Sequence, residues 1–324
     1  IIVNKSTSPI GTADGIRDIM ESQRPEFRPW RVVSNPEFLR EGSAIYDCLH
    51  PSRVVLGADD VESAQAVARL YQGLNCPVII SDLHTAEMIK YASNAFLATK
   101  ISFINEVARI CDALGADVST VADGMGMDSR IGREFLNAGL GYGGSCFPKD
   151  VAALTDMAAG AGLHPQLLNA VTDINTDQRR WIVDLLATRL GGLAGKEIAM
   201  LGLTFKPNTD DLRQAPAVEV AERLLAGGAH VRLYDPVASV MVPGATMHLS
   251  TESAMTGADA VLLATEWEEF TRIDWREAAA VMRGRLVLDG RNSLDPVAVL
   301  DAGLEYQGIG RRASTRAGRD SVPA

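Results

Sequence analysis

The sequence predicts an α/β protein in which two parallel-sheet domains are joined by a central helical region. Short apolar runs alternate with helical patterns over residues 1–83, long helical patterns fill residues 84–190, and the alternation resumes over residues 191–310. Such alternation is typical of parallel sheets with helices on both faces. The chain starts inside a predicted strand, without an initiator Met. We therefore expect a fragment whose first domain is incomplete at its N-terminus.

In residues 1–83, short apolar runs predict strands and amphipathic spacing predicts helices. The predicted strands are Ile1–Asn4, Arg31–Ser34, Val54–Gly57 and Val78–Ser81, and the predicted helices are Gly11–Glu21 and Val61–Gly73.

Residues 84–190 carry long stretches with helical spacing. The predicted helices are Ala86–Leu114, Val118–Gly124, the segment after Pro148, and Pro165–Leu190. The last of these is long and has an apolar stripe, so it either covers its own domain or forms a dimer seam.

Gly191–Gly195 is a predicted linker to the second α/β domain. The strands expected there are Glu197–Leu203, His230–Tyr234, Ala260–Ala264 and Arg285–Asp289, with a helix at Ala215–Ala226. Residues 311–324 are rich in Arg, Ser and Gly, which predicts a disordered tail.

The composition is that of a globular chain without membrane spans. Of the 324 residues, 47% are hydrophobic and 22% are charged, and the net charge is −10. This charge argues against nucleic-acid binding, so any anionic ligand must be held by a few placed cations. No apolar run reaches membrane-spanning length. The cysteines Cys48, Cys76, Cys111 and Cys146 lack metal-type or disulfide spacing, which favours a reducing, cytoplasmic location.

Cys146 is the strongest candidate for a reactive side chain. It lies between the glycine-rich stretch 141–144 and a helix that Pro148 is expected to open. The helix N-terminus and Lys149 favour a thiolate, whereas Asp150 opposes it unless that carboxylate points elsewhere. The alternative is a small buried cysteine in a tight turn. The flanking Gly, Lys and Asp residues favour the reactive thiol.

Two further pairs of polar residues indicate chemistry. Glu37 and Glu41 follow a predicted strand, at the edge where α/β sheets bind ligands. A solvated helix start is the alternative for this pair. Lys90 and Asn94 share one face of an otherwise apolar helix, so they are either ordinary surface residues or partners inside a site.

Glycines and cations suggest a phosphate-bearing ligand. The stretch 139–144 allows close backbone approach, although such loops are often plain turns. Lys206, Arg213 and Arg291 follow predicted strands and suit phosphate binding. The five histidines form no triad and no metal-type spacing, so we expect no metal site.

Together these motifs resemble the UDP-glucose/GDP-mannose dehydrogenase family. The resemblance runs from Lys5 to Pro296 in the family's order. Within the family, the string Phe135–Asp150 resembles the UDP-glucose 6-dehydrogenase branch, because GDP-mannose enzymes follow the cysteine with Leu. The resemblance implies Rossmann-like folds for both α/β domains. It makes residues 1–83 the C-terminal half of an NAD-binding domain, 84–190 a dimerisation and catalytic domain, and 191–310 a UDP-sugar-binding domain.

The activity that the resemblance implies is the oxidation of UDP-glucose to UDP-glucuronate, a precursor for polysaccharide biosynthesis. Two NAD⁺ are consumed as four electrons leave the C6 alcohol, through a thiohemiacetal and a thioester on Cys146. The other implied roles are oxyanion stabilisation (Lys90, Asn94), water positioning or deprotonation (Asp150), the base of thioester hydrolysis (Glu37) and holding of the catalytic water (Thr7).

The resemblance also implies binding residues. Those for the nucleotide sugar are Phe38, Leu39, Phe135, Leu136, Asn137, Gly139, Tyr142, Gly143, Phe205, Lys206 and Arg291. Those for NAD are Ser6, Thr7, Glu41, Lys149 and Arg213. Arg130 is implied to reach the substrate of a neighbouring subunit, which implies a homodimer or a larger homo-oligomer.

The sequence departs from the family in one respect. No Gly-x-Gly-x-x-Gly turn precedes Ile1, and the acidic residue that binds the ribose is also missing. We therefore expect this chain alone to bind NAD poorly and to be inactive. Two other hypotheses stay open: a GDP-mannose or UDP-amino-sugar 6-dehydrogenase, and an inactive sugar-nucleotide-binding protein. The presence of Cys146 together with Lys90, Asn94 and Asp150 argues against the inactive protein.

Overall fold

The chain divides into two units in the computed structural model, which describes residues 1–27, 29–239 and 242–311. The first unit comprises Ile1–Phe96 and Lys149–Pro165, and the second comprises Leu97–Pro148 and Gln166–Ala324. Two helices, α4 and α6, contribute residues to both units.

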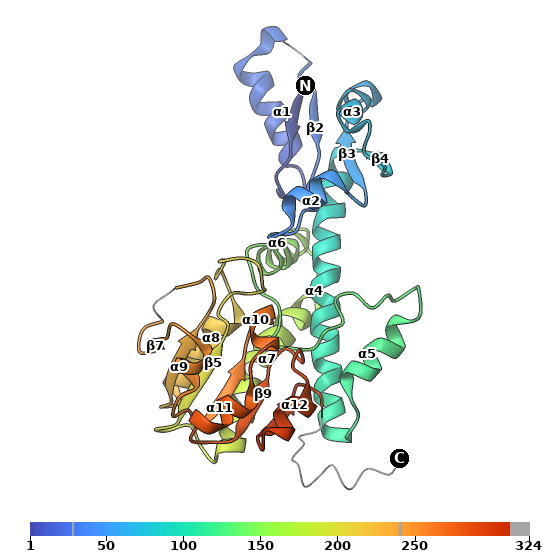
Figure 1. The fold of residues 1–324 in the computed structure, drawn as a ribbon. Coiled ribbons are helices and arrows are strands. Elements are labelled where there is room, and N and C mark those ends of the chain that lie inside the picture. The colour runs from blue at the N-terminus through green and yellow to red at the C-terminus, as the bar shows by residue number, and fades with distance from the viewer. Residues whose placement is uncertain (28, 240–241, 312–324) are drawn as a thin grey trace. The chain divides into compact units, whose positions relative to one another are not determined.

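The sheet of the first unit has the strand order β1-β2-β3-β4 (Figure 1). Its strands are β1 (Ile2–Asn4), β2 (Val32–Ser34), β3 (Val54–Ala58) and β4 (Val78–Ser81), as the apolar runs predict. The helical elements between them are α1 (Thr12–Gln23), η1 (Pro25–Phe27), α2 (Ala44–Leu49), α3 (Val61–Ala68) and η2 (Arg69–Tyr71). Val32 and Val33 are adjacent in β2 and lie in different core clusters, so both faces of this strand are buried.

This first sheet is not purely parallel. β1 pairs with β2 and β3 pairs with β4 in parallel, but β2 and β3 are antiparallel, with Val33 opposite Ala58. The connection between β2 and β3 carries only the six-residue helix α2. A parallel pair needs a crossover that packs on the sheet, whereas an antiparallel neighbour does not. The alternation of strand and helix does not reveal this reversal.

Long helices fill the middle of the chain, as predicted. They are α4 (Leu83–Leu114), α5 (Val118–Gly126), α6 (Phe147–Gly160) and α7 (Gln166–Leu190). Pro148 is the second residue of α6, where its missing N–H costs no hydrogen bond.

The sheet of the second unit has the strand order β10-β9-β8-β5-β6-β7, and its neighbouring strands are all parallel (Figure 1). The strands are β5 (Glu197–Leu201), β6 (His230–Tyr234), β7 (Thr246–Met247), β8 (Ala260–Leu263), β9 (Leu286–Asp289) and β10 (Glu305–Gly308). The helices of this region are α8 (Pro216–Ala226), α9 (Thr251–Met255), α10 (Glu268–Thr271), α11 (Trp275–Val281) and α12 (Pro296–Asp301).

Both faces of this sheet are covered. Ile198 and Met200 of β5 belong to a core cluster with α7 and α8, whereas Ala199 and Leu201 belong to a second cluster with α9, α11 and α12. Side chains alternate between the faces of a strand, so the two clusters are separate layers. The second α/β domain is therefore doubly wound, which confirms the predicted fold class.

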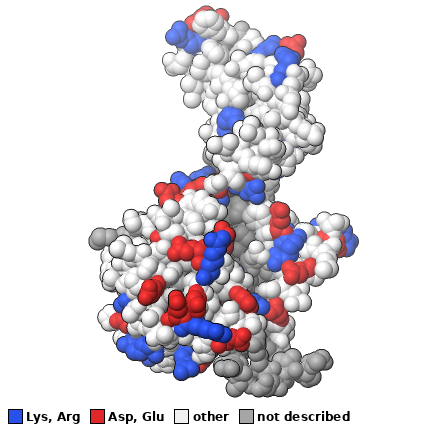
Figure 2. All heavy atoms as spheres, viewed as in Figure 1, with Lys and Arg blue, Asp and Glu red and all other residues white. Residues whose placement is uncertain are grey.

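The surface and the chain end bear on two further predictions. No helix within the described residues is long and apolar enough to cross a membrane. On the visible face of the second unit, acidic and basic side chains are interspersed (Figure 2).

Arg311, the first residue of the predicted tail, donates to Asp117 at 3.0 Å and to Tyr306 at 3.3 Å. Residues 312–324 of that predicted tail lie outside the described residues.

A half-buried carboxyl near the end of α4 makes stability depend on pH. Asp112 accepts from the backbone N–H of Gly310 at 3.1 Å. Burial raises the pKa of Asp112 to about 6, although that N–H lowers it. The pKa is higher in the folded state, so the ionised carboxyl destabilises the fold above pH 6. This loss of folding stability becomes smaller as the pH falls from about 6 to about 4, and it is absent below pH 4.

We expect Asp112→Asn to stabilise the protein at pH 8 by about 1 kcal/mol, after allowing for solvent screening, because the amide keeps the acceptor without the charge. The melting temperature should rise by roughly 2–4 °C at pH 8 and stay unchanged at pH 4. An equal shift at both pH values would mean that the charge of Asp112 is not the cause.

Candidate active site

Lys90 and Asn94 are the centre of the polar cluster in the first unit. They lie one turn apart on α4, and only 4% of Lys90 and 6% of Asn94 is exposed. The alternative of ordinary surface residues is therefore wrong. Lys90 Nζ lies 3.5 Å from Glu37 Oε1, and Asn94 Nδ2 donates to Asp150 Oδ2 at 2.6 Å. Lys90 and Asn94 thus each have an acidic partner from another segment.

Phe38 lies next to two cations. The Arg53 guanidinium carbon is 3.8 Å from the centre of its ring, and Lys90 Nζ is 5.2 Å from it. Arg53 also donates to Ser93 Oγ on α4 at 3.4 Å, and burial lowers the pKa of Arg53. Stacking of this kind fixes the orientation of Phe38 next to Glu37. Arg53 was not predicted; it directly precedes β3, and no feature of the sequence pairs it with Phe38.

Asp150 is bound on both carboxylate oxygens. Besides the bond from Asn94, its Oδ1 accepts from Lys149 Nζ at 2.5 Å, and only 1% of the residue is exposed. The sequence left open where this carboxylate points, and in the structure it points to Asn94 and Lys149. Burial, followed by the charge of Asp150, raises the pKa of Tyr91. The bonds to Asn94 and Lys149 leave acceptor lone pairs on Asp150 for a water molecule.

The residues expected to bind NAD in the first unit lie near the carboxyl end of β1. Ser6 and Thr7 follow this strand, and Lys5 Nζ donates to Asn35 Oδ1 at 3.2 Å after β2. Among the described residues, the hydroxyls of Ser6 and Thr7 have no hydrogen-bond partner. Glu41 is exposed in the loop before α2. Two free hydroxyls at the carboxyl edge of a parallel pair suit a dinucleotide ligand.

Cys146 belongs to the second unit and immediately precedes α6. Its side chain is exposed, so the alternative of a small buried cysteine is wrong. Its Sγ lies 3.6 Å from Ser145 Oγ. Phe147, the first residue of α6, packs against Phe135 and Tyr142, with ring centres 6.1 and 6.2 Å apart. An exposed thiol at the N-terminus of a fourteen-residue helix meets the requirement for a nucleophile.

The glycine-rich loop before Cys146 is held by buried amide side chains. Asn105 Oδ1 accepts from the N–H of Gly139 at 2.8 Å, and Gln178 Nε2 donates to the carbonyl of the same residue at 2.8 Å. Asn175 makes the same pair of bonds with Tyr142, at 2.8 and 3.0 Å. The side chains come from α4 and α7, so these two helices fix the path of the loop.

The glycines allow the loop to touch the segments that follow β5 and β9. A Cβ at Gly143 would lie 2.2 Å from the carbonyl oxygen of Gln214, and one at Gly144 would lie 2.8 Å from the Phe205 ring. Arg291 donates to the carbonyl of Phe205 at 3.3 Å. The groups that approach these glycines thus belong to the chain itself. The loop, Phe205 and Arg291, predicted separately, lie together within the second unit.

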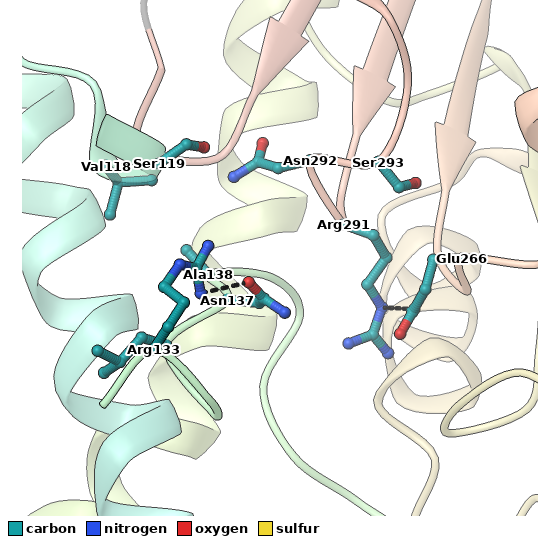
Figure 3. A pocket seen from close by; sticks show the side chains of 10 residues that line it. Val118, Ser119, Arg133, Asn137, Ala138, Glu266, Arg291, Asn292 and Ser293 are labelled. Carbon is teal, nitrogen blue, oxygen red and sulfur yellow. Dashed lines mark hydrogen bonds and ion pairs between the residues drawn. The ribbon is translucent and has the colours of Figure 1, made fainter. Parts of the chain in front are cut away.

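A cavity of about 320 Å³ opens at the carboxyl ends of β8 and β9 (Figure 3). On one side, Arg133 donates to Asn137 at 2.8 Å; on the other, Arg291 lies 3.2 Å from Glu266 and donates to the carbonyl of Ala264 at 2.7 Å. The residues that line the cavity are Val118, Ser119, Arg133, Leu136, Asn137, Ala138, Glu266, Arg291, Asn292 and Ser293.

Three of these residues, Leu136, Asn137 and Arg291, are predicted substrate-binding residues. Glu266 was not predicted. It follows β8, however, and ligands bind at the carboxyl ends of parallel strands, so its position could have indicated it. Its Oε2 is buried and lies 3.2 Å from Arg291 Nε, whereas Ser293 Oγ is buried without a hydrogen-bond partner among the described residues. An unpaired buried hydroxyl in a cavity is suited to a hydroxyl or N–H group of a ligand.

The remaining predicted cations have partners within the chain. Arg130 forms a pair with Asp128 on the surface, with 88% of its side chain exposed, and it does not line the cavity. Arg213 donates to both oxygens of Asp211, and its carbonyl accepts from the N–H of Gly144 at 3.0 Å. The Lys206 ammonium lies 5.4 Å from the centre of the Phe205 ring. The described residues contain no cluster of His, Cys, Asp or Glu that could hold a metal ion.

Three family models match the chain in succession. They describe the UDP-glucose/GDP-mannose dehydrogenase family and are its NAD binding domain (residues 1–75), its central domain (84–177) and its UDP binding domain (199–296).

Curated relatives and solved structures agree with these matches. UDP-glucose 6-dehydrogenase YwqF of Bacillus subtilis is 46% identical over 98% of this chain and 73% of its own length. A UDP-glucose 6-dehydrogenase of Pseudomonas aeruginosa is 44% identical, over 96% of this chain and 72% of its own. The structure of a UDP-glucose dehydrogenase from Pyrobaculum islandicum has a TM-score of 0.87 at 39% identity and covers 96% of this chain and 70% of that chain.

Proposed function

The chain belongs to the UDP-glucose/GDP-mannose dehydrogenase family, and on that premise we propose that it oxidises the C6 alcohol of UDP-glucose to the carboxylate of UDP-glucuronate. Members of this family are NAD-dependent oxidoreductases, and the chain carries the NAD-binding domain match. The observation that supports the proposal best is the exposed Cys146 at the start of α6, after a loop whose glycines fit against Phe205 and Gln214.

Cys146 is the nucleophile of the proposed reaction. Its thiolate adds to the C6 aldehyde carbon, so that a C–S bond forms and the carbonyl electron pair moves to the oxygen. This covalent bond keeps the aldehyde from leaving between the two oxidations. When bound, NAD⁺ accepts the hydride in each oxidation. In the last step water adds to the thioester carbonyl, the C–S bond breaks, and the thiolate is restored.

The polar cluster of the first unit supplies the charges and protons of these steps. The Lys90 ammonium and the Asn94 amide stabilise the oxygen that becomes negative at C6. Both side chains are held before substrate arrives, by Glu37 and Asp150 respectively. Asp150 orients the hydrolytic water and Glu37 takes its proton. Thr7, whose hydroxyl has no partner among the described residues, helps to hold that water.

The free hydroxyls of Ser6 and Thr7 fit a dinucleotide at the carboxyl end of β1. We assign them to NAD together with Glu41, Lys149 and Arg213. These last three are charged and have other contacts within the chain.

The nucleotide sugar is assigned to the second unit. The cavity lined by Asn137, Glu266 and Arg291 has polar groups suited to a uridine moiety, and Glu266 and Arg291 belong to the segment that matches the UDP binding domain. Lys206 and Arg291 supply the positive charge for the diphosphate. Phe38 and Leu39 of the first unit complete the assigned substrate residues, with Phe135, Leu136, Gly139, Tyr142 and Gly143 from the glycine-rich loop.

We also propose that the protein is a homodimer or a larger homo-oligomer. Phe103 and Ile110 are exposed on α4 with a spacing of seven residues, and Leu114 follows four residues later. An exposed apolar stripe of this kind is typical of a helix that packs against another helix. Arg130 is exposed and does not line the cavity. We assign it to the substrate of the neighbouring subunit. All four cysteines are free thiols, which fits the reducing cytoplasm.

The purified protein, expressed at its full natural length, should form two NADH for each UDP-glucuronate when it is given UDP-glucose and NAD⁺. GDP-mannose and UDP-N-acetylmannosamine, at the same concentration, are the comparison substrates and should react at least tenfold more slowly. Faster oxidation of either comparison substrate would assign the protein to another branch of the family. One NADH per molecule would contradict the four-electron reaction, and no turnover with any substrate would favour a binding protein.

Neutralising Arg291 or Lys206 should act mainly on substrate binding. Arg291→Met and Lys206→Met each remove a charged group from the assigned diphosphate contacts, worth about 1.5–3 kcal/mol. We expect the KM for UDP-glucose to rise roughly 10- to 100-fold, with kcat within about threefold of the parent value. Steady-state kinetics at saturating NAD⁺ would measure both. Equal losses in kcat and kcat/KM would instead place these residues at the reacting carbon.

A further inference from the structure

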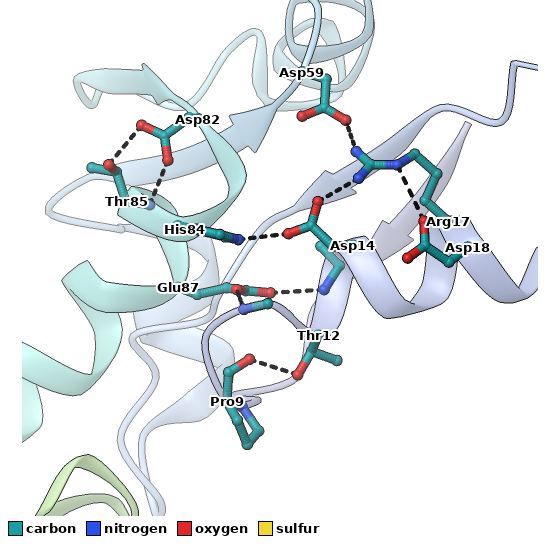
Figure 4. A network of polar contacts seen from close by, with 12 residues as sticks. Pro9, Thr12, Asp14, Arg17, Asp18, Asp59, Asp82, His84, Thr85 and Glu87 are labelled. Atoms are coloured by element: carbon teal, nitrogen blue, oxygen red, sulfur yellow. Dashed lines mark hydrogen bonds and ion pairs between the residues drawn. The ribbon is translucent and has the colours of Figure 1, made fainter. Parts of the chain in front are cut away.

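α1 is capped by a residue from another helix. Its N-cap, Gly11, has φ +91° and no side chain to accept from the first N–H groups. Glu87 of α4 does so instead: Oε2 accepts from Gly11 N at 2.7 Å and Oε1 accepts from Ala13 N at 3.0 Å (Figure 4). Only 3% of Glu87 is exposed. Both oxygens of a buried carboxylate are therefore committed to the start of α1.

This arrangement differs from the other caps of the chain. α3 and α5 are capped from within their own segments, by Asp60 and Asp117. A local Ser or Asp would have sufficed to cap α1 as well. Among the described residues no Lys or Arg pairs with Glu87, so the helix N–H groups are what compensate its burial. The cap from α4 thus connects two segments of the chain, besides satisfying N–H groups at the start of α1.

The segment that Glu87 holds is the one that carries Ser6 and Thr7. The N–H and hydroxyl of Thr12 both bind the carbonyl of Pro9, at 3.0 and 2.6 Å, which joins this segment closely to the first turn of α1. Fixing Gly11 and Ala13 therefore limits the freedom of the residues just before them.

Glu87 also lies on the helix face that carries the proposed oxyanion contacts. Lys90 follows it by three residues and Asn94 by seven, so the three side chains share one face of α4. All three are buried.

We propose that Glu87 is a positioning residue, which sets the Ser6–Thr7 segment at a fixed place relative to Lys90 and Asn94. This inference rests on the proposed function, because it assumes that the hydroxyls of Ser6 and Thr7 bind NAD and that Lys90 and Asn94 contact the oxyanion. Glu87 would hold the first pair at a fixed position relative to the second. Glu87 itself touches neither substrate nor cofactor.

Glu87→Gln is the decisive variant. The side chain keeps its shape, but the amide has one acceptor oxygen, so one of the two N–H groups loses its partner. We expect the Kd and the KM for NAD⁺ to rise about tenfold and kcat to fall about tenfold, with the KM for UDP-glucose unchanged within twofold. Calorimetric titration with NAD⁺ gives the Kd without turnover, and hydrogen exchange at Gly11 and Ala13 should become faster.

Asp14→Asn is the matched control. Asp14 lies in the first turn of α1, and His84 of α4 binds it at 2.6 Å, so it joins the same two helices without contacting the cap (Figure 4). Although burial raises the pKa of Asp14, hydrogen bonds from His84 and Arg17 bring it below its usual value. We expect this variant to bind NAD⁺ within twofold of the parent protein. Gly11→Ala, which strains the φ of +91°, should instead reproduce the Glu87→Gln pattern.

Three outcomes would overturn the inference: NAD⁺ affinity unchanged in Glu87→Gln, equal losses in Glu87→Gln and Asp14→Asn, or a KM for UDP-glucose that rises as much as that for NAD⁺. The first would remove the positioning role, and the other two would reduce Glu87 to general support of the fold. A parent protein that prefers another nucleotide sugar contradicts only the proposed substrate, because the NAD⁺ titration of the variants is read without it.

Discussion

Cys146→Ser is expected to lower the rate of UDP-glucuronate release by at least about a thousandfold. The serine hydroxyl is a far weaker nucleophile than a thiolate at neutral pH, so capture of the aldehyde slows. Any ester that forms breaks down more slowly than a thioester, because an alkoxide is a poorer leaving group than a thiolate. Binding of UDP-glucose should be nearly unchanged, since Cys146 is not among its assigned contacts, which include Asn137 and Arg291 of the cavity. Single-turnover experiments with quantification of the acid would measure the effect.

Cys48→Ser is the matched control for this prediction. Cys48 is also an exposed free thiol, but it lies on α2 and has no role in the proposed chemistry. It should retain the kcat of the parent protein within about twofold. Mass spectrometry of Cys146→Ser during turnover should detect either an adduct on the introduced serine or no adduct at all. Release of UDP-glucuronate by Cys146→Ser at the rate of the parent protein would contradict a thioester on Cys146.

The sequence predicted elements with an apolar run or a periodic stripe well, and short elements without either pattern poorly. β1 to β4 are short but mostly apolar runs, and the apolar stripes of α4 and α7 extend over several turns, so both kinds of element were recognised. α2, α10 and β7 have six residues or fewer, and packing around them determines their structure. The antiparallel pairing of β2 with β3 is likewise a tertiary feature, because either direction buries the same valines.

The same distinction applies to the site. Cys146, Lys90, Asn94 and Asp150 were predicted because each has a local pattern, either a glycine loop, a helix start or a shared helix face. Arg53 had no such pattern, and Glu87 was not predicted although it shares a helix face with Lys90. The partners of both are distant in sequence: Arg53 stacks on Phe38, and Glu87 binds Gly11 and Ala13.

Lys90→Met should lower kcat by roughly 10²- to 10³-fold, the usual effect of removing one donor to a developing oxyanion. The apolar chain of Met fills most of the space of the Lys stem, so the buried side of α4 stays packed. Glu37 would lose its partner at 3.5 Å, but it is partly exposed and can be hydrated, so the expected loss of stability is small. The KM for UDP-glucose should change by less than about threefold, because the ammonium is assigned to the reacting oxygen and not to the diphosphate.

A comparison of Lys90→Met with the carboxyl variant Glu37→Gln separates this role of Lys90 from simple support of the fold. If Lys90 stabilises the oxyanion, Glu37→Gln should leave the first hydride transfer in place and slow mainly the hydrolysis of the thioester, whereas Lys90→Met slows both oxidations. Lys196→Met, which removes a lysine that precedes β5, is the control and should leave kcat unchanged. Rapid-quench measurement of the NADH burst distinguishes the steps. A full burst in Lys90→Met would show that the ammonium acts after the first oxidation, and the assignment of Lys90 to the C6 oxyanion would then be wrong.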